Sequence, residues 1–229
     1  MILKEWEALP KELQLAEVKP YYELLKERKG SLVLKRVFDI IVSFCMLICL
    51  LPVFLVLAIA IKLDSPGPVF FRQERITQYG RVFRIFKFRT MVNNAEKLGA
   101  QVTTKNDMRI TKVGSMIRST RLDEIPQLIN IFLGDMSYVG TRPEVKKYVD
   151  QYTPEMMATL LLPAGVTSTA CIKYKDEAKL LDEANDVDKV YVEDVLPGKM
   201  AYNLRDMKEF TFMKEIKLMF ETVFAVLEN

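Results

Sequence analysis

An uncharged apolar run near the start of this chain constrains its fold more than any other feature. The run occupies the 22 positions from Ile40 to Ile61 and carries no charged residue. As a helix it would be about 33 Å long, which is enough to cross a bilayer hydrocarbon core of about 30 Å. Buried helices of soluble proteins are seldom so long and so apolar, so the run predicts a membrane segment.

The residues around and within this run predict how it enters the membrane. Lys35 and Arg36 precede it and Lys62 follows it, and the positive-inside rule then places both ends in the cytoplasm. Pro52 removes a backbone hydrogen bond and clashes with the preceding turn, which bends a helix. We therefore predict a re-entrant membrane helix over residues 35–62 that is broken at Pro52.

The segments on either side have different patterns. Residues 1–34 predict an amphipathic N-terminal extension of one or two short helices, lying on a membrane interface or a partner chain. Residues 63–229 predict an α+β, mainly helical domain that contains a short β-hairpin and amphipathic surface helices. The hairpin strands are expected at Val69–Arg72 and Val82–Thr90, around a turn at Tyr79 and Gly80. Helices are expected at 94–99, 113–119, 126–134, 144–162, within 175–194 and at 210–227, and a further short strand at 169–174.

The composition narrows the chemistry that the domain can perform. The chain has no histidine, which excludes Ser-His-Asp and Cys-His catalysis and His-ligated zinc. Its three cysteines are spaced too widely for a disulfide framework or a metal site. Residues 62–121 hold 13 Lys and Arg against 4 Asp and Glu, a balance that suits phosphates, nucleic acid or an anionic membrane. Catalysis must therefore depend on carboxylates, Lys, Tyr, Cys or a hard metal ion.

Two adjacent carboxylates, Asp123 and Glu124, are the candidate catalytic residues. They come directly before a predicted helix, because Pro126 suits its first turn and Gly134 suits its end. The positive end of the helix dipole favours their ionised forms. An ionised Asp is a candidate nucleophile and Glu a candidate Mg²⁺ ligand. The alternative is that the pair only caps the helix.

Cationic residues surround this pair in the sequence. Arg118 precedes it, and Arg142 lies in the turn that follows the helix, where we expect it to reach back toward Asp123. Lys87 and Arg89 alternate with phenylalanines in the second hairpin strand. This basic strand is either an ordinary solvated face or a cationic wall beside a phosphate site or a membrane.

Several motifs, in this order, resemble those of one family. They are KRVFDI at 35–40, KLDSPGPVFFRQERI at 62–76, FKFRTM at 86–91, RSTRLDEIPQLINIFLGDMSYVGTRPE at 118–144 and VLPGKM at 195–200. Together they resemble the bacterial sugar transferases known as monotopic phosphoglycosyl transferases, which start exopolysaccharide, O-antigen or glycoprotein glycans. The resemblance extends from about residue 34 to residue 229.

The resemblance implies a reaction and a set of roles. Asp123 would attack a UDP-sugar and form a covalent phosphosugar intermediate while UMP leaves, and a polyprenol phosphate such as undecaprenyl phosphate would then accept the phosphosugar. Glu124 would help to hold Mg²⁺, with Asp123 as a second candidate metal ligand. Arg118 and Arg142 match the phosphate-contacting arginines of the family, and Lys87 and Arg89 are weaker candidates.

The resemblance also implies a location and partners. The domain would lie on the cytoplasmic face of the bacterial plasma membrane, in contact with membrane lipids. A homodimer stays open, and no nucleic acid is expected. The alternative function is a catalytically silent, membrane-anchored scaffold for other glycan-assembly enzymes. A third hypothesis is a basic membrane-surface module that binds anionic lipid or nucleic acid, which would leave the carboxylate pair unexplained.

Three departures from the family pattern bear on these expectations. Leu51 replaces the small polar residue that often precedes the mid-helix proline, and Thr141 replaces the first proline of the usual PRP motif. LPAGVTS stands at 162–168 in place of an arginine-containing turn. The last change leaves the transferred sugar undetermined.

Overall fold

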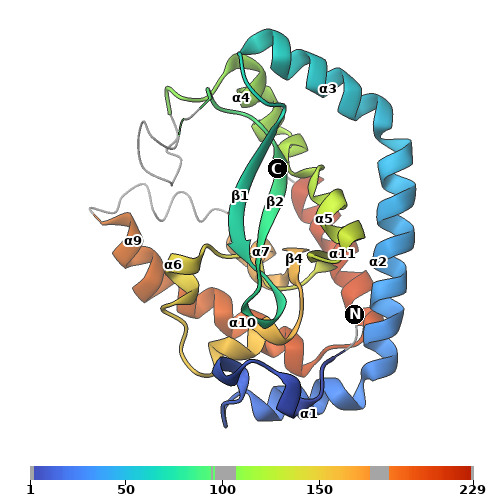
Figure 1. Cartoon of the computed structure of the whole chain (residues 1–229), viewed down its shortest axis with the longest axis vertical. Coiled ribbons are helices and arrows are strands. Elements are labelled where there is room, and N and C mark those ends of the chain that lie inside the picture. The colour runs from blue at the N-terminus through green and yellow to red at the C-terminus, as the bar shows by residue number, and fades with distance from the viewer. Residues whose placement is uncertain (1–2, 94, 96–106, 176–185, 228–229) are drawn as a thin grey trace.

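The structure is a computed structural model that describes residues 3–93, 95, 107–175 and 186–227. Figure 1 shows a long bent helix pair, α2 and α3, which runs along one side and over one end of a body of shorter helices. A β-hairpin lies at the centre of this body, and α1 and α10 lie at the end opposite α3 (Figure 1). The arrangement confirms the predicted α+β, mainly helical class with its hairpin.

The elements are named in chain order, with η for short 3₁₀ turns and, at η7, a π-helical turn. The first half comprises η1 (Trp6–Ala8), η2 (Lys11–Leu13), α1 (Lys19–Glu27), α2 (Lys29–Cys49), α3 (Leu51–Asp64), β1 (Phe70–Ile76), η3 (Gln78–Gly80), β2 (Val82–Phe88), α4 (Lys112–Ser119) and η5 (Leu122–Glu124). The second half comprises α5 (Gln127–Leu133), β3 (Met136–Val139), α6 (Lys146–Val149), η6 (Met156–Leu161), β4 (Ala164–Thr167), α7 (Thr169–Lys173), α9 (Val187–Val190), η7 (Tyr191–Val195), α10 (Leu196–Lys208) and α11 (Phe212–Leu227).

Helices α2 and α3 meet at a bend of 60° around Leu50. Pro52 lies in the first turn of α3, where it has no N–H to continue the hydrogen-bond pattern of α2. The break therefore occurs although Leu51 offers no polar side chain. Among the described residues no single helix is long and apolar enough to cross a membrane, whereas α2 and α3 taken together have the length and composition to do so.

The bent pair has one packed face and one exposed face. On the packed side Leu57 and Ile61 of α3 are buried against Phe88 of β2 and Ile117 of α4. Large apolar side chains are exposed along the other side at Ile41, Phe44, Ile48, Leu55, Val56, Ile59 and Leu63. The body of the protein thus covers only part of this apolar surface.

The two strand pairs differ in how well their sequences predict them. Strands β1 and β2 form the expected antiparallel hairpin, with Phe70 opposite Phe88 and Ile76 opposite Val82. Strands β3 and β4 form a parallel pair that we did not predict, with Met136 opposite Ala164. The strand expected at 169–174 is wrong, because this segment is helix α7, which Ser168 caps by accepting a hydrogen bond from the backbone N–H of Cys171.

The single helix expected at 144–162 is also wrong. It divides into α6 and η6, with Thr153 and Pro154 between them. A residue before proline avoids the helical conformation, which accounts for the interruption. The helix expected at 210–227 is confirmed as α11, and the helix expected at 113–119 is confirmed as α4. Of the helix expected at 94–99 only residue 95 is described. In the acidic segment residues 176–185 lie outside the described residues, and the helix expected within 175–194 is confirmed in the described part as α9 and the start of η7.

The N-terminal segment packs on the body of the protein. Leu13, Val18 and Tyr22 are buried in one cluster with Leu161 of η6 and Met207 of α10. The N-terminal segment therefore lies on the body of its own chain, and no membrane or partner chain is required to cover these side chains.

This packing predicts a large loss of stability when Leu13 is truncated. Leu13→Ala removes a side chain that is only 1% exposed, and such substitutions lower the free energy of unfolding by about 2–5 kcal/mol. The apparent melting temperature in detergent should fall by several degrees. Lys11→Ala, in the same 3₁₀ turn but exposed, is the control. Equal stability of the two variants would show that the segment does not contribute to the core.

Candidate active site

Asp123 and Glu124 lie on the 3₁₀ turn η5, directly before helix α5. Arg121 enters this turn with a φ of 55°, in the left-handed region that residues other than glycine seldom adopt. Pro126 occupies the N-cap of α5, and Gly134, with a φ of 88°, ends it, so the predicted helix bounds are confirmed. The two carboxylates therefore directly precede the helix, as predicted.

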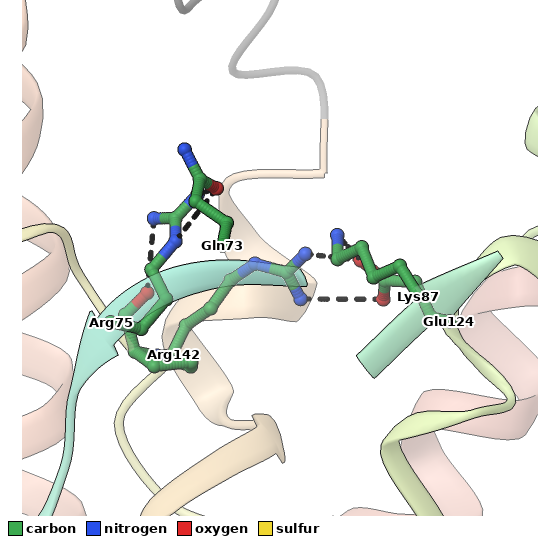
Figure 2. Close-up of polar contacts among 6 residues, drawn as sticks. Gln73, Arg75, Lys87, Glu124 and Arg142 are labelled. Carbon is green, nitrogen blue, oxygen red and sulfur yellow. Dashed lines mark hydrogen bonds and ion pairs between the residues drawn. The ribbon is translucent and has the colours of Figure 1, made fainter. Parts of the chain in front are cut away.

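Glu124 lies between two cationic side chains, as Figure 2 shows. The ammonium Nζ of Lys87 is 2.7 Å from Glu124 Oε1. The guanidinium of Arg142 pairs with both oxygens, through Nη2 to Oε1 and through Nη1 to Oε2 at 3.4 Å. We predicted that Arg142 would reach toward Asp123. The structure corrects this, because the partner of Arg142 is the neighbouring carboxylate.

These contacts fix the charge of Glu124. Burial by itself raises the pKa of this carboxyl, but the positive charges and hydrogen bonds of Arg142 and Lys87 outweigh it and hold the pKa well below its usual range. The negative charge of Glu124 in turn raises the pKa of Arg142. Glu124 is therefore ionised at every physiological pH, and its charge is already compensated by protein cations.

Asp123 has a different electrostatic environment. Burial raises its pKa, Lys87 and Arg118 oppose that shift, and the charge of Glu124 adds to it. The net shift is upward, opposite to the effect expected from the helix dipole alone. A carboxylate that is poorly stabilised as an anion is a better nucleophile than one held in an ion pair.

Lys87 is placed by the attachment of the hairpin to α5. The side chain of Asn130, on α5, accepts a hydrogen bond from the backbone N–H of Phe86 at 2.8 Å and donates one to the carbonyl of Arg84 at 3.1 Å. Asn130 is fully buried, so this contact locks the register of β2 against the helix that follows the carboxylates. The basic strand is thus, at Lys87, a cationic wall of the site.

Arg142 is placed by a residue that our sequence predictions missed. Arg75 on β1 donates a hydrogen bond to the carbonyl of Pro143 at 3.2 Å. Gln73, two positions earlier on the same strand, accepts from Arg75 at 2.7 Å and orients it (Figure 2). One feature of the sequence could have identified this pair: Gln73 and Arg75 are two positions apart, which puts them on the same face of a strand.

The other two candidate arginines have different positions. Arg89 is buried and donates hydrogen bonds to the carbonyls of Ser65 at 2.7 Å and Pro66 at 2.6 Å, directly after α3. Its guanidinium is thus used to fix the end of α3, which does not fit the phosphate-binding role that we predicted. Arg118, in the last turn of α4, lies close enough to Asp123 for its charge to lower the pKa of that carboxyl.

A cavity of about 340 Å³ opens beside Glu124. Glu124, Arg142 and Arg121 contribute polar groups to its lining. The remainder is mainly apolar and comes from α2, α5, β3, β4, α7 and α11. Met46 and Leu50, at the bend of the helix pair, belong to this lining. The cavity therefore connects the charged residues with the end of the apolar helix α2.

Comparison with known proteins places the chain in a family. A family model described as bacterial sugar transferase matches residues 30–229. The chain belongs to this bacterial sugar transferase family. The match begins within the last residues of the N-terminal extension and includes every candidate site residue.

Characterised bacterial sugar transferases are similar to the chain over most of its length. A UDP-N-acetylgalactosamine-undecaprenyl-phosphate N-acetylgalactosaminephosphotransferase of Aeromonas hydrophila is 35% identical over 197 residues, which are 85% of this chain and 44% of the relative. A UDP-glucose:undecaprenyl-phosphate glucose-1-phosphate transferase of Klebsiella pneumoniae is 36% identical over 200 residues, 85% of this chain and 40% of the relative. The chain thus spans less than half the length of these two relatives.

The residues of this sugar transferase can be tested for their fit to Mg²⁺. In proteins that handle phosphates, Mg²⁺ is usually bound by one or two carboxylates together with the substrate phosphates. Asp123 and Glu124 supply two adjacent carboxylates, and the part of the chain that the structure describes contains no group of three or more His, Cys, Asp or Glu side chains arranged for a metal. The residues therefore fit an ion that is bound largely by the substrate.

Proposed function

We propose that this sugar transferase moves a sugar 1-phosphate from a UDP-sugar to a polyprenyl phosphate, such as undecaprenyl phosphate, and releases UMP. The names of the Aeromonas and Klebsiella relatives describe transfers of this kind. The observation that carries the proposal is the unequal setting of the adjacent carboxylates. Arg142 and Lys87 neutralise Glu124, while burial disfavours the anion of Asp123.

In the first step a carboxylate oxygen of Asp123 attacks the phosphorus that bears the sugar. A phosphorus–oxygen bond forms to Asp123, the bond from that phosphorus to the bridging oxygen breaks, and UMP leaves with this oxygen. Arg142, Lys87 and Arg118 place positive charge around the reacting phosphates, which stabilises the charge that develops in phosphoryl transfer. Glu124 keeps Arg142 and Lys87 in position.

In the second step an oxygen of the polyprenyl phosphate attacks the same phosphorus. The bond to Asp123 breaks, its carboxylate is regenerated, and a polyprenyl diphosphate sugar is formed. The acceptor is already anionic, so no general base is needed, which agrees with a chain that has no histidine. Two displacements at one carboxylate predict ping-pong kinetics.

Mg²⁺ belongs to this proposal through the phosphates. Glu124, together with Asp123, would hold it, and when bound it would neutralise diphosphate charge and so make UMP a better leaving group. Arg142 and Lys87 already contact the carboxylate of Glu124. A metal ion held by Glu124 would therefore lie close to these two cations, and all three would face the same diphosphate.

A membrane location follows from the acceptor. A polyprenyl tail stays in the bilayer, so the active site must be held at its surface. The exposed apolar face of α2 and α3 and the bend at Leu50 support a re-entrant segment. The positive residues at its two ends support a cytoplasmic domain.

Labelling of engineered cysteines tests this topology. Cys45, Cys49 and Cys171 are replaced, and single cysteines are placed at positions 33 and 63. Both should react with an impermeant reagent added outside inverted vesicles, whose outer surface is the cytoplasmic face of the membrane, and neither should react when the reagent is added to intact cells. Labelling from opposite sides would indicate a spanning helix and would contradict the re-entrant arrangement.

The function itself is tested by following UMP. Protein in nanodiscs is incubated with single UDP-sugars and Mg²⁺, first without acceptor and then with undecaprenyl phosphate. We expect a burst of at most one UMP per protein, followed by turnover once the acceptor is added. Absence of UMP with every UDP-sugar would favour the silent scaffold instead.

A further inference from the structure

The cavity beside Glu124 is the feature that the proposed donor reaction leaves unexplained. Arg121 and Glu124, at the catalytic turn, line one part of it. Met46 and Leu50, at the bend of the membrane helix, line another. A compartment with one end in the charged site, a mainly apolar lining and its other end at the bend of the membrane helix has the layout required by an amphiphile. A UDP-sugar has no extended hydrocarbon chain to place along such a lining.

The lining of the cavity separates into a polar part and an apolar part. Leu128 and Ile131 of α5 and Val166 of β4 contribute apolar surface. The hydroxyls of Thr167 and Thr222 also line the cavity, but they hydrogen-bond each other at 2.8 Å. Most of the interior therefore provides little to which the hydroxyls of a sugar or the edge of uracil could bind.

The polar part contains groups suited to a phosphate. Arg142 and Arg121 both line it. In the described part of the chain, no side chain forms an ion pair or hydrogen bond with the guanidinium of Arg121. Lys175 is a third cationic residue in the lining. Cationic groups beside Glu124 match a dianionic head group.

Gln127 is an independent indication that the polar part is incomplete without a ligand. Its side chain is 1% exposed and lines the cavity, yet its amide nitrogen and oxygen have no hydrogen-bond partner among the described residues. Buried amide groups are nearly always hydrogen-bonded, since leaving one unpaired is costly. An oxygen of a phosphate bound near Arg121 could accept from the Gln127 nitrogen.

We propose that this cavity binds the acceptor, with the phosphate at Arg121, Arg142 and Gln127 and the first isoprenoid units against the apolar wall that ends at Leu50. This assignment rests on the proposed transferase function and adds to it the binding site of the second substrate. Arg121 is an acceptor-binding residue in this assignment.

Two variants test the two ends of the cavity separately. Arg121→Asn removes the charge and keeps a residue type that tolerates the left-handed backbone. Val166→Phe fills part of the apolar wall, whereas Val166→Ala enlarges it. Arg84→Gln, at an exposed arginine on β2 that pairs with Glu74, is the matched control for loss of one positive charge.

The half-reactions are measured apart. The burst of UMP without acceptor reports the donor step, and discharge of the preformed intermediate by undecaprenyl phosphate reports the acceptor step. We expect Arg121→Asn to raise the acceptor concentration for half-maximal discharge about tenfold or more. Val166→Phe should do the same and Val166→Ala should not, and in Arg121→Asn and Val166→Phe the donor step should be slowed far less than discharge.

Equal losses in the two half-reactions would make the cavity part of the donor site and would overturn the assignment. Unchanged discharge in both Arg121→Asn and Val166→Phe would also overturn it.

A binding measurement keeps the assignment separate from the transferase proposal. Cys171 lines the cavity, so in a protein with Cys45→Ala and Cys49→Ala its alkylation should be slowed by undecaprenyl phosphate without any turnover. The protection should weaken in Arg121→Asn. Protection of Cys171 without any UMP formation would contradict the proposed reaction but support the cavity as the lipid-binding site. Full alkylation of Cys171 at saturating undecaprenyl phosphate would contradict the cavity assignment.

Discussion

Asp123→Asn is expected to lower the rate of UMP release by about 10⁴-fold or more, because the substitution removes the nucleophile and keeps its size. No phosphosugar should be trapped on the variant when UDP-sugar is supplied without acceptor. Release of UMP is followed in nanodiscs, and the modified residue is located by mass spectrometry of the trapped wild-type protein. The variant should keep its melting temperature, since an amide is less costly to bury than the carboxylate that it replaces.

Asp150→Asn is the matched control, because Asp150 is exposed and pairs on the surface with Lys146, four residues earlier. It should retain wild-type activity. Undiminished UMP release by Asp123→Asn, or a trapped phosphosugar on any other residue, would contradict the assigned nucleophile.

The pH dependence of the wild-type burst gives a second check on Asp123. Its ionised form is the nucleophile, and burial raises its pKa. The burst rate should therefore be constant at higher pH and fall as the pH is lowered through this raised pKa, above the value of about 3.9 of an ordinary aspartate. Glu124 adds no step in this range because Arg142 and Lys87 hold its pKa low.

Glu124→Gln is expected to lower the burst rate by about 10²- to 10³-fold without abolishing the covalent intermediate. The amide can still hydrogen-bond Arg142, but it no longer balances the charges of Arg142 and Lys87 or offers an anionic oxygen to Mg²⁺. The phosphosugar should accumulate slowly on Asp123, and the Mg²⁺ concentration for half-maximal rate should rise about tenfold or more.

Glu74→Gln, at an exposed carboxylate paired with Arg84, should leave both the rate and the Mg²⁺ requirement unchanged. A Glu124→Gln protein with an unaltered Mg²⁺ requirement would show that this carboxylate only positions the cations. A protein that forms no intermediate at all would contradict the division of roles between the two carboxylates.

The parts of the fold that were predictable from sequence depend on local signals. Pro126 and Gly134 mark the two ends of α5, and Gly80 marks the turn of the hairpin. Pro52 acts on the preceding turn of its own helix. In each case the determining interaction lies within about four residues, so neighbouring letters are enough to predict it.

The parts that were missed depend on contacts between distant segments. Arg142 pairs with Glu124 instead of Asp123 because Arg75, 67 positions earlier, fixes the carbonyl of Pro143, the residue after Arg142. Arg89 was assigned to phosphate because its position in a basic strand does not reveal that it binds the end of α3. Sequence spacing identified the charged residues of the site but could not show which of them face each other.

The packing of the N-terminal segment has a consequence for protein engineering. The family match begins at residue 30, yet the cluster around Leu161 and Met207 is closed by Leu13, Val18 and Tyr22. A chimera in which residues 1–29 are replaced and residues 30–229 are kept would therefore cut through a hydrophobic core. Such a fusion should carry residues 3–27 with the catalytic domain, because the unit that folds is larger than the unit that relatives share.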